Sequence, residues 1–309
     1  MRFSVYQESH IGGRKVNQDR MGYSYTRDAL LLLLADGMGG HLHGEIAATI
    51  AMETIGSLFQ QLAKEYIKKP ERFLEDSFFA AHREIHRYRA DHGLPETPRT
   101  TIVVCLVQHN TAFWAHCGDS RLYWMRDGQV LARTRDHSRI ETLIAQGRVD
   151  PSERATHPDR NKLFNCLGAP NLPIVEISRR ASLQAGDVIL LCSDGLWGVL
   201  PDNVLTHSLQ NNTIVRAVPE LISSATSIAG KNSDNVTALA MMWESGASLA
   251  DPNSITTNIL PPGTITTTIQ STLESDAGPV DGYDDSAIEK AIEEIRCSIE
   301  KSARITPRN

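Results

Sequence analysis

The chain has 309 residues, of which 41% are hydrophobic and 22% charged, an ordinary globular composition with room for one large domain or two small ones. Its formal net charge is -6, so no basic excess points to nucleic acid or to an anionic membrane as a partner. The longest apolar run, Ala29 to Ala35, is far shorter than the ~20 residues that a membrane span needs.

The cysteines indicate a reducing compartment. There are five, and no two stand in a C-x-x-C pair, so neither a disulfide framework nor a zinc site is expected. The first residues, Met1 to Gln7, carry no apolar signal core. We therefore expect a cytoplasmic protein with no membrane contact.

The first 244 residues alternate between strand-like and helix-like runs. Strands are predicted at 4–7, 21–25 and 30–35. Two amphipathic helices follow, because apolar residues recur at steps of three and four from Ala47 to Leu62 and again from Leu74 to Tyr88.

A meander is predicted after Thr101, with strands at 101–107, 111–117, 121–125 and 130–133. The short links permit antiparallel neighbours and leave no room for the helical crossover that parallel pairing needs. A doubly wound nucleotide-binding sheet is therefore disfavoured. Further along, we expect a helix at 137–146, a polar flap at 150–167, a strand at 188–193, helices at 201–209 and 214–229, and a last strand at 236–243.

The composition changes after Trp243. Residues 245–284 hold threonine clusters and a Pro-Pro pair with almost no aromatic side chain, and we interpret them as a disordered linker. An isolated amphipathic helix is predicted at 285–303, where four isoleucines recur at steps of four and three, and a disordered tail at 304–309. Such a helix is marginal alone in water, so we expect its apolar face to bind a groove on a partner protein, on a second copy or on its own domain.

Aspartates stand at or just past the ends of predicted strands: Asp19, Asp36, Asp119, Asp194 and Asp234. Carboxylates that gather in one place repel each other and are costly to desolvate unless a cation joins them. Oxygen ligands suit hard divalent ions such as magnesium or manganese, and two such ions can activate a water for in-line attack on phosphorus. One Asp-Gly pair alone is more simply a turn. Five aspartates at strand ends favour a metal centre.

A series of motifs resembles those of bacterial type 2C protein phosphatases, in that family's order, from about Ser4 to Trp243. The motifs are Arg14-Lys15-Val16-Asn17-Gln18-Asp19, Asp36-Gly37-Met38-Gly39-Gly40-His41, Gly118-Asp119-Ser120-Arg121, Asp136-His137-Ser138, Asn165-Cys166-Leu167-Gly168, Ser193-Asp194-Gly195-Leu196-Trp197 and Asp234-Asn235-Val236-Thr237. The resemblance implies that residues 1–244 form a catalytic domain of α+β class, in which two antiparallel β-sheets form a sandwich flanked by helices on both sides. It also implies hydrolysis of phosphoserine and phosphothreonine in protein substrates, with two or three Mn²⁺ or Mg²⁺ ions as cofactors.

The resemblance also implies roles for the metal-binding positions. Asp36 bridges two ions, and the backbone carbonyl of Gly37 binds one of them. Asp194 and Asp234 complete the second ion's ligands. Asp119, together with Asp194, holds a third and weaker ion near the flap.

Two further residues are expected to act on the substrate. Arg14 grips the phosphate, a role that suits a planar and permanently charged fork. His41 is the candidate general acid for the leaving serine or threonine oxygen. The simpler alternatives are a solvated surface charge for Arg14 and a capping or packing role for His41 beside His43.

The chain departs from the family pattern at two positions. The resemblance implies that Asp19 acts through water or from behind the metal ligands. The residue before it is the neutral Gln18, where the family often has glutamate. Arg99 stands where a glycine is common, which we interpret as a loop change with little catalytic weight.

Three other functions compete with this interpretation. A nucleotide-binding loop around Gly37 and Gly39 lacks its third glycine, because that position is Leu42. A catalytically silent phosphoprotein-binding scaffold is disfavoured because all the metal aspartates are present. A metal-dependent phosphatase of small phosphorylated metabolites is not excluded by the acidic pattern.

Overall fold

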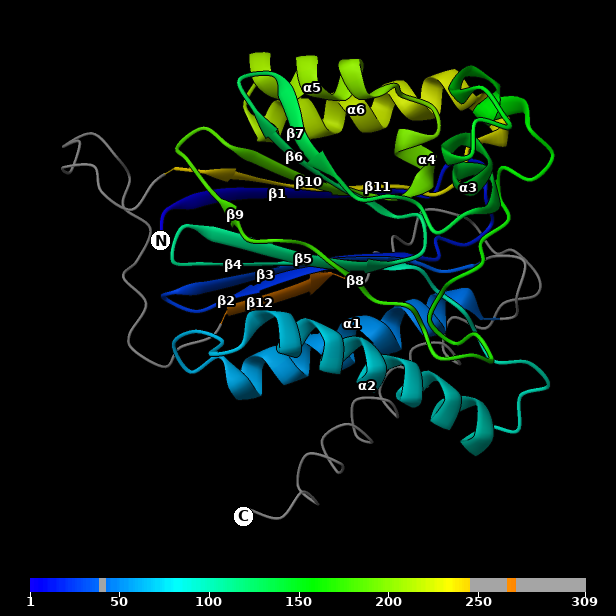
Figure 1. Cartoon of the computed structure of the whole chain (residues 1–309), viewed down its shortest axis with the longest axis horizontal. Coiled ribbons are helices and arrows are strands. Elements are labelled where there is room, and N and C mark those ends of the chain that lie inside the picture. The colour runs from blue at the N-terminus through cyan, green and yellow to red at the C-terminus, as the bar shows by residue number, and fades with distance from the viewer. Residues whose placement is uncertain (39–42, 245–265, 271–309) are drawn as a thin grey trace.

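The computed structural model describes residues 1–38, 43–244 and 266–270 (Figure 1). In these ranges the chain forms two antiparallel sheets that stack face to face, with helices on both outer sides. This four-layer arrangement confirms the α+β sandwich that the family resemblance implies.

The first sheet joins the two ends of the domain. Its strand order is β1-β11-β10-β6-β7, and neighbouring strands are antiparallel. The bounds are β1 Phe3–His10, β6 Arg121–Arg126, β7 Gln129–Arg133, β10 Val188–Cys192 and β11 Val236–Trp243. Because β1 pairs with β11 along its whole length, from Phe3 opposite Trp243 to His10 opposite Val236, the first strand of the domain is fixed to the last.

The second sheet has the order β12-β2-β3-β4-β5-β8, with β9 also paired to β5. The bounds are β2 Asp19–Tyr25, β3 Ala29–Asp36, β4 Ile102–Gln108, β5 Thr111–Cys117, β8 Glu176–Ile177, β9 Ala181–Ser182 and β12 Thr266–Gln270. The predicted meander is therefore split. β4 and β5 lie in this sheet, and the chain crosses to the first sheet at residues 118–120, between β5 and β6.

Helices cover both outer faces of the sandwich (Figure 1). The bounds are α1 Gly44–Leu62 and α2 Pro70–Asp91 on the second sheet, α5 Asp202–Asn211 and α6 Ile214–Ala229 on the first, with the shorter α3 Arg139–Ala145, α4 Asp194–Trp197, η1 Pro151–Thr156 and η2 Gly230–Asn232. None of the helices in the described ranges combines the length and the apolar character needed to cross a membrane.

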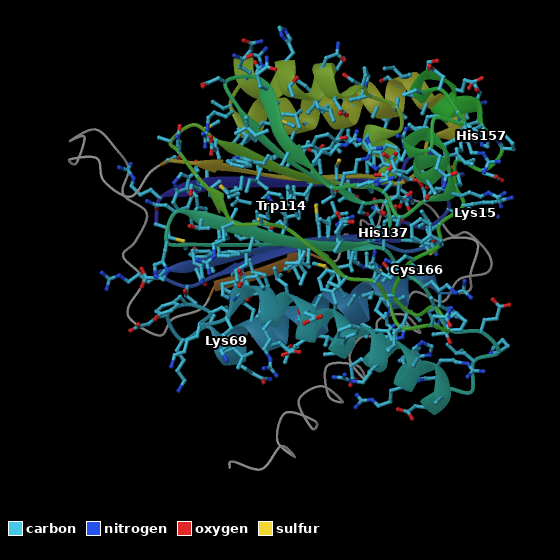
Figure 2. The ribbon with its side chains drawn as sticks, viewed as in Figure 1. Lys15, Lys69, Trp114, His137, His157 and Cys166 are labelled. Carbon is cyan, nitrogen blue, oxygen red and sulfur yellow. The ribbon has the colours of Figure 1, made fainter. Side chains whose placement is uncertain are left out.

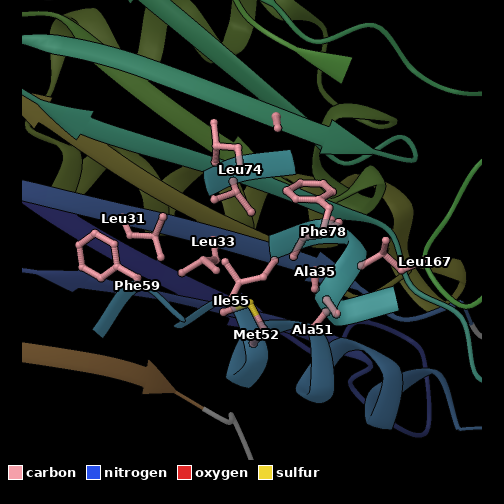
Figure 3. Packing of buried hydrophobic residues seen from close by; sticks show 14 of the residues in the cluster. Leu31, Leu33, Ala35, Ala51, Met52, Ile55, Phe59, Leu74, Phe78 and Leu167 are labelled. Carbon is pink, nitrogen blue, oxygen red and sulfur yellow. The ribbon is translucent and has the colours of Figure 1, made fainter. Parts of the chain in front are cut away.

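The leucine run of β3 explains how the layers are held together. Leu31 and Leu33 pack in the cluster under α1 and α2, whereas Leu30, Leu32 and Leu34 pack between the two sheets. Successive side chains of a strand point to opposite faces, so a strand that is covered on both faces needs an unbroken apolar run. Figure 3 shows Leu31 and Leu33 against the helical side chains. Full burial of each leucine contributes roughly 2 kcal/mol.

One segment differs from the sequence prediction. Thr266–Gln270, inside the predicted disordered linker, forms β12 along the edge of β2. Thr267 Oγ1 lies 2.9 Å from Ser24 Oγ and accepts a hydrogen bond from Gln60 Nε2 at 2.7 Å. The segment is too polar to fold alone, but an existing sheet edge supplies partners for its backbone, and β-branched threonine suits a strand. The rest of the linker, the helix predicted at 285–303 and the tail at 304–309 lie outside the described residues.

The helix predicted at 137–146, which is α3 in the structure, is also shorter than predicted. It begins at Arg139 rather than at His137, and its N-cap is Ser138, whose Oγ accepts a hydrogen bond from the Glu141 N–H. A serine in extended conformation is a favoured N-cap. The cap leaves His137 outside the helix, where its ring is free to contact other elements.

Candidate metal centre

Two of the aspartates face each other across neighbouring strands. Asp19 is the first residue of β2 and Asp36 the last of β3, and the antiparallel register places them directly opposite. The backbone of Asp36 is fixed by the two residues that precede β4, because its carbonyl oxygen accepts hydrogen bonds from Thr100 Oγ1 at 2.8 Å and from the Thr101 N–H at 2.9 Å. Both carboxylates therefore leave the second sheet at one end.

Two more aspartates come from the other sheet. Asp194 follows β10 and starts α4, and Asp234 stands just before β11. Because β10 and β11 are antiparallel neighbours, the end of one strand adjoins the start of the other. The Ser193 N–H donates to the Thr237 carbonyl at 3.1 Å and closes this junction.

Asp119 lies in the crossing between the sheets. It is buried in the turn that joins β5 to β6. Trp197 Nε1 donates to its carbonyl oxygen at 3.0 Å, and the neighbouring Ser120 Oγ lies 2.7 Å from Thr101 Oγ1. The turn is thus attached both to α4 and to the residue that precedes β4.

Electrostatics shows that the structure brings all five carboxylates together. Burial raises the pKa of Asp36 well above its usual value, and repulsion from Asp19, Asp194, Asp119 and Asp234 raises it further. The same two causes, in the same order, raise the pKa of Asp194. Burial also raises the pKa of Asp19 to about 6 and that of Asp119 to about 7. The five aspartates can all be ionised at neutral pH only if positive charge is added among them.

The donor set fits a hard divalent cation. Asp19 Oδ1 is buried and has no hydrogen-bond partner among the described residues, although Oδ2 accepts from Ser193 Oγ at 2.8 Å. An unpaired buried carboxylate oxygen is costly unless a cation or water joins it. With aspartate oxygens as ligands, the suitable ions are magnesium and manganese.

Gly37 permits a close approach of backbone next to Asp36. A Cβ at this position would stand 2.5 Å from the carbonyl group of Gly44 and 2.8 Å from the carbonyl oxygen of Gln18. Any other residue would push the start of α1 away from β3. The glycine in the Asp-Gly pair is therefore a packing requirement here, as well as a candidate for binding an ion through its carbonyl.

The predicted phosphate-binding residue pairs with one of the aspartates. Arg14 Nε donates to Asp234 Oδ1 at 2.8 Å and Arg14 Nη2 donates to Asp234 Oδ2 at 2.6 Å, a bidentate pair. The guanidinium is more than half exposed and faces the acidic centre, since Asp194 and Asp36 also act on its charge. His41 lies outside the described residues, so its role as a general acid stays a prediction.

No role was predicted from the sequence for two side chains that link separate segments at the centre, Ser193 and Asn235. Ser193 Oγ bonds Asp19, as above, and also accepts from the Thr237 N–H at 3.1 Å. Asn235 Nδ2 donates to the carbonyl oxygens of Ile11 at 2.9 Å and Val16 at 3.1 Å. Both residues belong to the motifs that contain a metal aspartate, but their contacts could not be predicted, because a serine or asparagine in such a place is typical of an ordinary turn.

A separate group of metal-binding residue types lies beside the Asp119 turn. His116, His137 and Glu176 place ligand atoms within 4.8 Å of one another. The two imidazole rings stack with centroids 4.5 Å apart. His137 belongs to a predicted motif, whereas nothing in the sequence singled out His116 or Glu176.

Comparisons with known proteins agree with this geometry. The family model described as "Protein phosphatase 2C" matches residues 6–231. The chain is 32% identical over 214 residues to the serine/threonine protein phosphatase PstP of Mycobacterium tuberculosis, covering 68% of this chain but only 40% of that protein's length. It is 28% identical to the serine/threonine phosphatase stp of Listeria monocytogenes over 73% of this chain and 90% of that protein. A solved structure of the PstP catalytic domain in complex with 2 manganese ions has a TM-score of 0.65 and 29% identity, with 78% of this chain and 97% of that chain covered.

Proposed function

Because this chain belongs to the protein phosphatase 2C family, we propose that it hydrolyses phosphoserine and phosphothreonine in proteins at a centre of two manganese or magnesium ions, or three. The observation that carries the proposal is the convergence of five aspartates from both sheets, with the pKa of four of them raised by burial and mutual repulsion. Ionised carboxylates in this arrangement repel one another, and bound divalent ions would offset that repulsion. The manganese-bound relative supports the choice of ion.

The aspartates divide between the ions as the motifs imply. Asp36 and the Gly37 carbonyl would hold the first ion, Asp36 with Asp194 and Asp234 the second, and Asp119 with Asp194 a weaker third. Asp19 would act from behind, held by Ser193 Oγ. When bound, such ions act as Lewis acids that lower the pKa of water and neutralise phosphate charge.

Arg14 positions the phosphate. Its fork matches the two oxygens of a carboxylate, as the Asp234 pair demonstrates, and a phosphate offers the same spacing. Once Asp234 serves as an ion ligand, the guanidinium is available to substrate in the ground state. His41 would give a proton to the departing serine or threonine oxygen, a role that rests on its motif alone.

The tail and the location complete the proposal. The helix predicted at 285–303 would bind a groove on a partner protein, on a second copy or on its own domain, beyond the strand β12 that pairs with β2. The described cysteines, Cys105, Cys117, Cys166 and Cys192, are free thiols, which fits the cytoplasmic location proposed from the sequence.

The test compares substrate classes on the full chain. With manganese present, we expect a far higher kcat/KM on phosphothreonine peptides than on sugar phosphates or other small phosphomonoesters. The reverse preference would assign the centre to small metabolites. Binding of phosphopeptides without release of phosphate would indicate a silent scaffold. Either result contradicts the proposed function.

A further inference from the structure

His137 clamps the residue next to Asp119. Its backbone N–H donates to the Gly118 carbonyl at 2.9 Å, and its ring Nδ1 accepts from the Gly118 N–H at 3.2 Å. His137 is only 6% exposed and lies between the sheets at one end of the sandwich (Figure 2). One histidine therefore binds both backbone polar groups of Gly118, its N–H and its carbonyl oxygen.

The turn needs such support. Gly118 has a φ of +114°, a conformation that is accessible mainly to glycine. A glycine in such a turn loses much conformational entropy when ordered, so external hydrogen bonds must hold it. Because Asp119 directly follows Gly118, the position of Asp119 is only as well defined as the conformation of this turn.

The hydrogen bonds also define the tautomer of His137. Asn165 Nδ2 donates to Nδ1 at 2.6 Å, and the orientation of that amide is fixed because Asn165 Oδ1 accepts from the Ile174 N–H at 3.0 Å. With two N–H groups pointing at it, Nδ1 is a pure acceptor. The ring proton is therefore on Nε2, which faces Glu176 Oε2 at 3.4 Å.

This tautomer bears on the neighbouring cluster. A cation shared by His116, His137 and Glu176 would need the Nε2 lone pair of His137, and that nitrogen carries the proton. Moving the proton to Nδ1 would set it against two N–H donors. The cluster is therefore a hydrogen-bonded support rather than an ion site.

Asp136 and His137, which precede α3, connect the flap at 150–167 to the turn at 118–121. The Phe164 N–H, at the far end of the flap, donates to the His137 carbonyl at 3.0 Å. Asp136 forms a buried bidentate pair with Arg121, both contacts being 2.7 Å, and also accepts from Arg154 of η1 at 3.2 Å. Both sides of the 118–121 turn are thus linked to residues 136–164.

We propose that His137, as the neutral Nε2–H tautomer, is a positioning residue that holds the Asp119 turn in its ion-binding place and couples it to the flap. The inference rests on the assignment of Asp119 to the weaker ion in the proposed function. It predicts that the hydrogen bond to Nδ1, more than the bulk of the ring, sets the affinity for that ion.

Two substitutions in the full chain separate these contributions. His137→Asn places an amide oxygen close to where Nδ1 stands, so it can still accept from Gly118. His137→Gln leaves a methylene there and puts its polar group near the position of Nε2. Calorimetric titration with Mn²⁺ counts the ions and measures their affinities, and ¹⁵N NMR of the wild-type protein reports the tautomer of His137.

We expect His137→Gln to weaken the weakest Mn²⁺ site about tenfold while the tighter sites keep their affinity, and His137→Asn to stay within about threefold of wild type. The wild-type ring should show an unprotonated Nδ1. Equal losses in both variants, unchanged affinity in both, a protonated Nδ1, or a wild-type protein with no weak site would each overturn the inference. Absence of phosphatase activity in the wild type would instead contradict the proposed function, and the calorimetric comparison would still decide the role of His137.

Discussion

Replacing Asp19 by asparagine should stabilise the metal-free protein and reduce the further stabilisation that bound metal provides. Burial is the main reason why the pKa of Asp19 is raised from 3.8 to about 6 in the fold. The folded protein therefore holds a proton that the unfolded chain has released, and stability falls as the pH rises through this window. One pKa unit corresponds to about 1.4 kcal/mol, so the carboxylate destabilises the metal-free fold by roughly 3 kcal/mol above the folded pKa.

Asparagine has the shape of the protonated side chain and no charge. In excess chelator at about pH 8, Asp19→Asn should raise the free energy of unfolding by up to roughly 3 kcal/mol, and by less than about 1 kcal/mol at about pH 4. In saturating Mn²⁺ the variant should lose part of the metal-induced stabilisation, because ions that bind only the folded state stabilise it. Urea unfolding followed by circular dichroism measures both.

A matched control is Asp76→Asn on α2, whose side chain is exposed beside Arg72. Its free energy of unfolding should move by less than about 0.5 kcal/mol in every condition. If Asp19→Asn destabilises the chelated protein at about pH 8 as much as at about pH 4, the carboxylate is not strained in the fold, and the electrostatic reasoning for a metal centre is wrong.

Three further changes test other parts of the account. Arg14→Ala should raise KM for phosphothreonine peptides by about tenfold or more, with Arg14→Lys only a partial rescue because an ammonium cannot form the fork, and an unchanged KM would remove Arg14 from the phosphate site. His41→Ala should lower kcat on alkyl phosphoesters far more than on aryl ones, whose leaving groups need no proton, and equal losses would exclude a general acid. Deleting residues 245–309 should leave peptide turnover within about twofold but change self-association on sizing columns, because it removes the helix predicted at 285–303 and also β12, which covers the edge of β2, and a folded but inactive truncation would contradict this.

Much of the fold could be predicted because local patterns determine it. The leucine run at β3 and the helical stripes of α1 and α2 appear in the sequence with the period that burial requires. Strand order could not be predicted, since it depends on pairing between distant segments, as when β1 closes on β11. β12 was missed for the same reason: its threonines gain a strand's hydrogen bonds only from β2.

In the candidate site, too, some residues could be predicted from the sequence and others could not. The aspartates were predictable because strand ends are visible in the sequence, and the antiparallel register then places Asp19 opposite Asp36. The support around them was not predictable. Ser193, directly after a strand of the first sheet, bonds Asp19 in the second sheet, and Asn165 of the flap bonds His137. These contacts form only once the layers have stacked.

The most direct test of the metal-centred account is phosphate release from a phosphothreonine peptide by the full chain, with and without Mn²⁺, beside Asp36→Asn. We expect activity in Mn²⁺, none in excess chelator, recovery when the metal is restored, and a loss of several orders of magnitude in the variant, because Asp36 lies among all four other carboxylates and would bridge the ions. Full activity in chelator, or in Asp36→Asn with Mn²⁺, would contradict the account.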